Sequence, residues 1–154
     1  MSDDAPWLRP YLACMIRSNT NRKGEIAVQR AILRALELGL NVCRPCIEGT
    51  RYDLAVERQS GRLERVQVKY CDHRPGRDGT YQLSLTRHCG GRARRVYGYG
   101  STEIDAVVGY LASHDCLVWL PAALWEGRTR IALRTHPARN GQRHGIHMAH
   151  DYRW

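Results

Sequence analysis

Apolar residues recur at helical spacing in the segment 24–38. They fall at i, i+3, i+4, i+7 and i+8, which makes one stripe of a helix apolar: Val28, Ala31, Ile32, Ala35 and Leu36. Gly39 is expected to end this helix, and Thr20 or Asn21 to cap its start. Glu25 would then lie in the first helical turn, where a negative charge interacts favourably with the helix dipole.

Shorter runs in which apolar and polar residues alternate follow the helix, and they predict β-strands. Three come first, at 42–46, 52–57 and 63–70. A turn at 59–61 separates the last two, so we expect them to form a β-hairpin. Further elements are expected as strands at 80–86, 104–111, 116–120 and 129–133, a turn at 113–115 and a helical turn at 121–125.

The alternation within the hairpin gathers polar side chains on one face. The apolar residues of both arms share the other face: Leu54, Val56, Val66 and Val68. If the turn is centred on Ser60, the numbers of paired residues sum to 120, which sets Asp53 opposite Gln67. In that register the two residues are about 5 Å apart, and Lys69 lies about 7 Å further along the same face.

These polar residues are of the types that bind a hard cation. Asp53 offers an anionic oxygen and Gln67 a neutral one, and Glu25 adds a second carboxylate if the helix packs beside the hairpin. Such a cation polarises a phosphate and activates water. Lys69 is placed to orient the attacking water or to stabilise charge on the phosphate. The pattern therefore indicates phosphodiester hydrolysis.

The charge of the chain favours a polyanionic partner. The 154 residues carry a formal charge of +9, and only two of the 24 basic side chains, Lys23 and Lys69, are lysines. Neutralising phosphates releases counterions, so nucleic acid is the leading candidate. The segment 88–100, rich in glycine and arginine, is expected to be a mobile loop. The candidate DNA contacts are Arg74, Arg77, Arg87, Arg92, Arg94, Arg95, Tyr97, Tyr99, Arg139 and Arg143.

The chain is expected to be a single domain over 1–154 that does not enter a membrane. No repeat or linker divides it, and no apolar run approaches the roughly 18 residues of a spanning helix. The N-terminal residues do not resemble a signal peptide, so we expect a cytoplasmic protein that is nucleoid-associated when it binds DNA.

The six cysteines are not spaced like a disulfide framework. In a cytosolic protein they would stay reduced, and we interpret them as small buried residues. Cys43 and Cys46 form a C-x-x-C pair, which His73, His88 or Cys89 could complete as a zinc site.

The stretches KGEIAVQRAILRALELGLNV, RYDLAV and VQVKY resemble the PD-(D/E)xK nuclease superfamily. The resemblance implies an α/β, restriction-endonuclease-like core with a mixed central sheet flanked by helices. It also implies metal-binding roles for Asp53, Gln67 and Glu25 and a catalytic role for Lys69. Two positions depart from the motif: Tyr52 replaces its proline, and Gln67 replaces an acid and so removes a negative charge.

The group I intron-encoded homing endonucleases of this superfamily are the branch that the chain resembles most. They use Gln-x-Lys, and the ending PARNGQRHGIHMAHDYRW looks like theirs, which makes 135–154 a C-terminal extension of the nuclease domain. The resemblance implies an endonuclease that cuts double-stranded DNA with Mg²⁺, with Mn²⁺ as a substitute. One chain offers one site while a duplex has two strands, so we expect a homodimer or homotetramer. The alternatives are a Holliday-junction resolvase, a restriction-type nuclease and a DNA-binding module with a decayed site.

Overall fold

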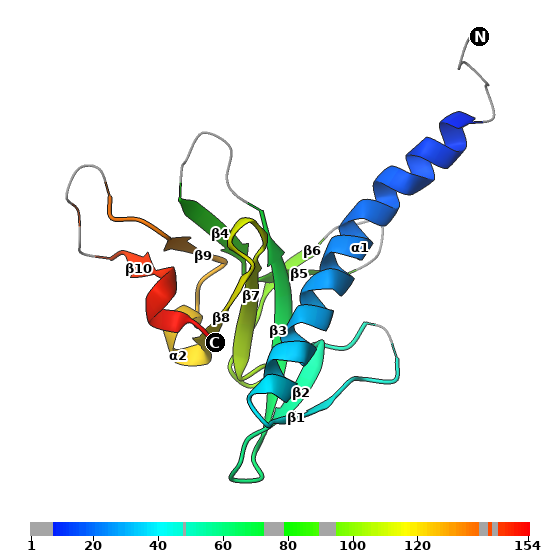
Figure 1. The fold of residues 1–154 in the computed structure, drawn as a ribbon. Helices are drawn as coiled ribbons and strands as arrows, with labels where there is room; N and C mark the ends of the chain where they lie inside the picture. The colour runs from blue at the N-terminus through cyan, green and yellow to red at the C-terminus, as the bar shows by residue number, and fades with distance from the viewer. Residues whose placement is uncertain (1–7, 48, 73–78, 90–94, 139–141, 143–144) are drawn as a thin grey trace.

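The computed structural model describes residues 8–47, 49–72, 79–89, 95–138, 142 and 145–154. Within these ranges, the side chains of 8–18, 88–89 and 95–96 lie outside the description. The fold has one long helix on one side of a five-stranded sheet and a smaller sheet on the other side (Figure 1). No helix in the described part of the chain is long and apolar enough to cross a membrane.

Helix α1 (Leu8–Glu37) is 30 residues long, twice the predicted span. The prediction of a start near Gly24 was wrong, because the segment before it contains no residue that interrupts a helix; Pro10 lies in the first turn, where proline is tolerated. Glu25 consequently lies in the second half of α1. The expected end is confirmed: Gly39 has φ +69°, and the N–H of Leu40 bonds to the carbonyl of Ala35 at 2.9 Å.

The apolar stripe of α1 packs on the large sheet, whose strand order is β1-β2-β3-β7-β8. Ala27, Val28, Ala31 and Ala35 are buried there, whereas Leu36 is 57% exposed, contrary to the prediction. The β3–β7 pairing is parallel and the other pairings are antiparallel, so the sheet is mixed as expected. Its strands are β1 (Asn41–Cys43), β2 (Leu54–Glu57), β3 (Leu63–Cys71), β7 (Ala106–Leu111) and β8 (Cys116–Pro121).

The opposite face of the large sheet is covered by a second sheet, whereas the resemblance implied a central sheet flanked by helices. Strands β4 (Thr80–Ser84), β9 (Arg130–Arg134) and β10 (His147–Met148) form it, in the order β10-β9-β4. Tyr81, Leu83 and Leu133 of this sheet share a core cluster with Val107 and Leu111 of the large sheet. The chain also forms three short helices: η1 (Ala112–His114), α2 (Ala122–Trp125) and η2 (Ala149–Tyr152). Residues of α2 and η2 belong to the core cluster between the two sheets.

Two short paired strands include part of the segment 88–100, where we expected a mobile loop, and residues 90–94 of that segment lie outside the described residues. Strand β5 (Thr86–Cys89) pairs with β6 (Arg95–Gly98) in an antiparallel register. Glycine weakens strand propensity, so the composition concealed these short strands. The predicted strand 80–86 accordingly ends earlier: β4 stops at Ser84 and β5 begins at Thr86.

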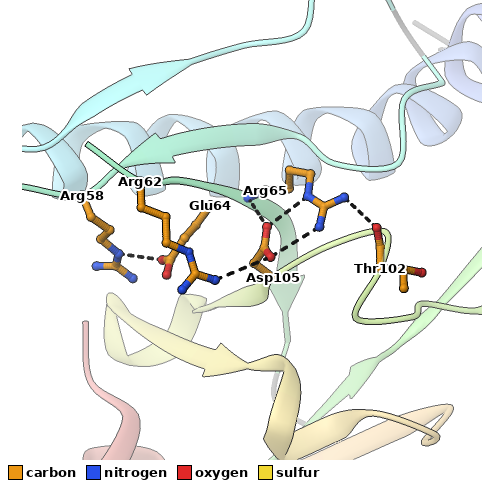
Figure 2. A network of polar contacts seen from close by, with 6 residues as sticks. All are labelled: Arg58, Arg62, Glu64, Arg65, Thr102 and Asp105. Atoms are coloured by element: carbon orange, nitrogen blue, oxygen red, sulfur yellow. Dashed lines mark hydrogen bonds and ion pairs between the residues drawn. The ribbon is translucent and has the colours of Figure 1, made fainter. Parts of the chain in front are cut away.

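A polar network ties the β2–β3 hairpin to the start of β7 (Figure 2). The Asp105 carboxylate accepts bonds from the backbone N–H of Arg65 at 2.8 Å and from its Nε at 3.0 Å. Arg65 Nη1 also donates to the carbonyl of Thr102 at 2.7 Å. Burial alone would raise the pKa of Asp105, but the bonds from Arg65 lower it overall. Because β3 and β7 are parallel neighbours, these contacts fix the register of the strand that carries Gln67 and Lys69.

The last residue of the chain contacts both α1 and the large sheet. The carbonyl of Trp154 accepts a bond from Arg34 Nε of α1 at 2.9 Å, and its N–H donates to Leu117 of β8 at 3.0 Å. The Trp154 ring lies 5.0 Å from that of Trp119. The C-terminal residues therefore close the edge between α1 and the large sheet, while their assignment as an extension of a single domain stays a prediction.

Candidate functional site

The hairpin register places Asp53 where the sequence predicted it. Strands β2 and β3 pair with residue numbers that sum to 120, as in Leu54 with Val66, which confirms the turn centre. The strand pairs end at Leu54 with Val66, and the backbone N–H of Asp53 bonds to the carbonyl of the same Val66 at 2.9 Å. Asp53 immediately precedes β2, and its carboxylate contacts the side chain of Gln67 and the backbone N–H of Val68.

The Asp53 carboxylate is half-buried and held by donors of β3. Its Oδ2 accepts a bond from the backbone N–H of Val68 at 2.7 Å and another from Gln67 Nε2. Burial raises the pKa of Asp53, while the Val68 N–H, the charges of Lys69 and Arg44 and the Gln67 amide oppose that rise. Its other oxygen, Oδ1, accepts no hydrogen bond within the described ranges.

Gln67 and Lys69 are two residues apart on β3 and lie on the face away from α1. Gln67 is 9% exposed. Lys69 is half-buried, and its Nζ donates to the hydroxyl of Tyr99 at 3.2 Å. Burial lowers the pKa of Lys69, and attraction to the Asp53 carboxylate counteracts this. The hairpin thus gathers a carboxylate, a primary amide and an ammonium, as the alternation predicted.

Glu25 reaches the same region from α1. A pocket of about 560 Å³ is lined by Glu25, Asp53 and Gln67, together with residues of the loop between β1 and β2. Glu25 is paired there with Arg44 through two contacts, at 2.9 and 3.2 Å, and accepts a bond from Gln29 at 2.7 Å. The bonds from Arg44, and then that from Gln29, lower the pKa of Glu25. Helix docking therefore brings Glu25 to the pocket, although not from a first turn.

Arg44 was missed by the sequence analysis. It is one of 22 arginines, and only the loop geometry shows that it faces the pocket and pairs with Glu25. The available signal was its place in the sequence, within the predicted strand 42–46 and shortly before Asp53.

The donor set fits a hard divalent cation that keeps most of its water. Asp53 offers Oδ1, and Gln67 offers Oε1 once its amide turns by half a rotation, which exchanges two groups of nearly equal shape. In the present orientation the Gln67 amide hydrogen-bonds the carboxylate that a cation would contact. No group of three His, Cys, Asp or Glu side chains suited to a metal occurs in the described part of the chain. Oxygen donors of this kind suit a hard divalent cation that retains part of its water.

Among the predicted DNA contacts, the structure describes the side chains of Arg87, Tyr97 and Tyr99. Arg87 and Tyr97 lie on the β5–β6 hairpin, where the Arg87 guanidinium lies 5.6 Å from the centre of the Tyr97 ring and pairs with Glu103 at 3.2 Å. Tyr97 is 41% exposed. Arg95 belongs to β6, but its side chain is not described. The remaining candidate arginines lie outside the described residues: Arg74, Arg77, Arg92, Arg94, Arg139 and Arg143.

Tyr99 does not occupy the surface position that we expected. Its side chain is 6% exposed and belongs to the core cluster between the two sheets, so its ring is not available to a base. Tyr99 follows β6 directly, and its backbone N–H bonds to the carbonyl of Leu85 at 3.0 Å, which continues the β5–β6 register by one pair.

The cysteines differ from the prediction that all are buried. Cys71 is buried and Cys116 half-buried, whereas Cys43, the last residue of β1, and Cys46, in the loop that follows, are exposed free thiols. Of the proposed zinc partners, His73 lies outside the described residues and the side chains of His88 and Cys89 are not described.

Comparisons with known proteins agree on one relationship. A family model described as PD-(D/E)XK endonuclease matches residues 18–154. A search of curated proteins found no match. Among solved structures, the bacterial homing endonuclease I-Ssp6803I is similar, with a TM-score of 0.71 and 27% sequence identity. The match covers 87% of this chain and 88% of that chain.

Proposed function

Because the chain belongs to the PD-(D/E)XK endonuclease family, we propose that it is a Mg²⁺-dependent endonuclease that cuts double-stranded DNA at specific sites. The family relationship and the α/β fold expected from the sequence are confirmed. The observation that carries the proposal is the hairpin that places Asp53 and Gln67 side by side, with the Lys69 ammonium near the same carboxylate.

We assign the following roles to the residues of the site. Asp53 and Gln67 would hold the cation, with Glu25 as a further ligand after release from Arg44. Bound there, a magnesium ion would polarise the scissile phosphate and activate water. Lys69 would orient the attacking water or stabilise negative charge on the phosphate, because a compact ammonium in a partly buried site acts strongly on nearby oxygens.

Basic side chains of the protein would bind the phosphates of the DNA. Net charge +9 supports sequence-independent binding to phosphates, and we propose that the β5–β6 hairpin with Arg87 and Tyr97 contributes. We therefore expect DNA affinity to fall steeply as salt rises; affinity that stayed constant between low and moderate salt would contradict this arrangement.

Site specificity and oligomeric state are proposed on two further grounds. The similar structure I-Ssp6803I is described as a homing endonuclease, and the Gln-x-Lys pattern and C-terminal residues resemble that branch. One chain carries one hairpin site, so cutting both strands calls for a symmetric dimer or a dimer of dimers. Sedimentation of the protein alone and on its target would test this, and a monomer in both states would refute it.

Cleavage of plasmid and of a randomised duplex library tests the central proposal. We expect cutting with Mg²⁺, no cutting with a chelator, and a loss of at least about 100-fold for Lys69→Ala and Asp53→Ala. Lys23→Ala is the matched control: it removes the only other lysine, whose ion pair with Asp72 at 2.6 Å is exposed. Metal-dependent cutting that survived either site substitution would contradict our assignment.

Gln67 supports a second candidate, a DNA-binding module without nuclease activity. The neutral amide already satisfies Asp53 without a metal. Salt-dependent DNA binding with no cutting of any duplex would favour this candidate. Branched junctions should be included as substrates, because preferential cutting of them would instead indicate a Holliday-junction resolvase.

A further inference from the structure

Tyr99 is the one aromatic side chain in contact with the Lys69 ammonium among the described residues. Its hydroxyl lies 3.2 Å from Lys69 Nζ, and the same nitrogen lies 5.1 Å from the centre of the Tyr99 ring. The residue comes directly after β6, and its backbone N–H bonds to the carbonyl of Leu85 at 3.0 Å. Tyr99 is thus fixed at its backbone and touches Lys69 through both its ring and its hydroxyl.

The contact with Tyr99 gives the Lys69 ammonium a fixed hydrogen-bond acceptor. A lysine side chain is a flexible four-carbon stem, so an ammonium without a fixed acceptor samples many positions. Burial keeps the Tyr99 phenol protonated, because it raises the pKa of Tyr99 to about 12. The hydroxyl is therefore a neutral acceptor for the ammonium, and it does not compete with the Asp53 carboxylate as a second negative charge would.

We propose that Tyr99 is a positioning residue that holds the Lys69 ammonium beside Asp53 and Gln67. The proposal rests on the proposed nuclease function, in which Lys69 acts on the phosphate or on the attacking water. Tyr99 acts through Lys69 and does not itself touch DNA, since its side chain is 6% exposed. Because Tyr99 directly follows β6, the position of the β5–β6 hairpin determines the position of the Lys69 ammonium.

A purely structural role for Tyr99 is the alternative, and Tyr110 offers a matched control. Both tyrosines are 6% exposed, and the hydroxyl of each bonds to a charged group; that of Tyr110 donates to Asp115 Oδ1 at 2.8 Å. Tyr110 belongs to the other core cluster, on the α1 face of the sheet. Replacing either residue by phenylalanine removes one buried hydroxyl, but only Tyr99→Phe removes the acceptor of Lys69.

The first measurement is the rate at which bound duplex is cut in a single turnover. We expect Tyr99→Phe to slow this step about tenfold, the size expected for losing one hydrogen bond to a charged group. DNA affinity in chelator should stay unchanged, and Tyr110→Phe should cut like the wild type. Tyr99→Leu, which also removes the ring, should be slower than Tyr99→Phe. Equal rates for Tyr99→Phe and the wild type would overturn the proposal.

A second measurement does not depend on cutting. The chain has only two lysines, so lysine labelled with ¹³C at Cε gives two assignable NMR signals, which Lys69→Arg distinguishes. In the wild type, the ring of Tyr99 should shift the ε-protons of Lys69 upfield and separate the two geminal protons. Tyr99→Leu should abolish both effects and leave the Lys23 signal in place.

The two measurements separate the possible failures. A wild-type protein that cuts no DNA would refute the proposed function, while the NMR signals would still decide whether Tyr99 fixes Lys69. If the Lys69 signal were unaffected by Tyr99→Leu, the positioning role would be wrong even for an active nuclease. If cutting slowed only in proportion to lost thermal stability, with Tyr110→Phe slowed equally, the structural alternative would hold.

Discussion

Replacing Gln67 by glutamate tests how the neutral amide shapes the site. Gln67 is 9% exposed and donates to Asp53, so the variant sets a second carboxylate against the first. Two charges about 4 Å apart repel by about 4 kcal/mol at an effective dielectric constant of about 20. The Lys69 and Arg44 charges near Asp53 offset part of this. We expect the metal-free variant to lose about 2 kcal/mol of unfolding free energy at neutral pH.

The pH dependence of this loss has a definite sign. Repulsion between the two carboxylates favours the protonated form and raises the pKa of the pair in the folded state, in the direction in which burial already shifts Asp53. When a carboxyl group has a higher pKa in the folded state than in the unfolded state, the folded state loses stability as the pH rises from the unfolded pKa through the folded pKa. The variant should therefore approach the wild type below about pH 4, the unfolded carboxyl range, and diverge from it towards neutral pH.

Magnesium should reverse the loss. A cation that binds only the native state stabilises it by about 2.7 kcal/mol at 100 times its Kd. Because the variant offers one more anionic oxygen, Mg²⁺ should raise its Tm more than that of the wild type. Urea and thermal unfolding with chelator and with Mg²⁺ measure this difference.

Gln29→Glu is the control for the charge change itself. Gln29 also donates to a carboxylate, that of Glu25 at 2.7 Å, but it does so on the exposed side of a helix. Like charges at this spacing cost no more than about 0.5 kcal/mol. A Gln67→Glu protein as stable as the wild type in chelator at neutral pH, or Mg²⁺ stabilising both equally, would refute the reasoning.

Three further outcomes are expected. Arg44→Ala should free Glu25 and tighten Mg²⁺ binding by calorimetry, while the unfolding free energy falls by less than about 1 kcal/mol because the ion pair is half exposed. Asp105→Asn should lower the unfolding free energy by about 1 to 3 kcal/mol. That loss should shrink in acid, since the lowered pKa of Asp105 stabilises the protein only above the unfolded carboxyl range. Gly109→Ala should destabilise by about 1 to 3 kcal/mol in urea unfolding, because its Cβ would lie 2.7 Å from a leucine methyl of the facing sheet.

The part of the site formed by adjacent strands could be predicted from the sequence. Strand alternation and a short turn determine which side chains share a face, and both are local properties. That is why the pairing of Leu54 with Val66, and with it the closeness of the Asp53 and Gln67 side chains, followed from the turn at Ser60. The same locality explains why most strands were predicted within a few residues of their observed bounds.

The contacts between distant segments could not be predicted in this way. The pairing of Glu25 with Arg44 depends on where α1 docks, and the contact of Lys69 with Tyr99 depends on a hairpin hidden in a glycine-rich stretch. The helix start was misplaced because possible capping residues occur inside the longer helix, where capping preferences do not apply. The two contacts join residues that are 19 and 30 positions apart in the sequence.

The charges of the site balance without a metal, and this follows from Gln67. Asp53 is matched by Lys69 and by two hydrogen-bond donors, and Glu25 is matched by Arg44. A glutamate at position 67 would leave one negative charge in excess, which a cation would have to neutralise. With glutamine, that excess arises only when a phosphate enters the site. Since magnesium favours sites that combine one or two carboxylates with substrate phosphates, the cation and the scissile phosphate should enter this site together.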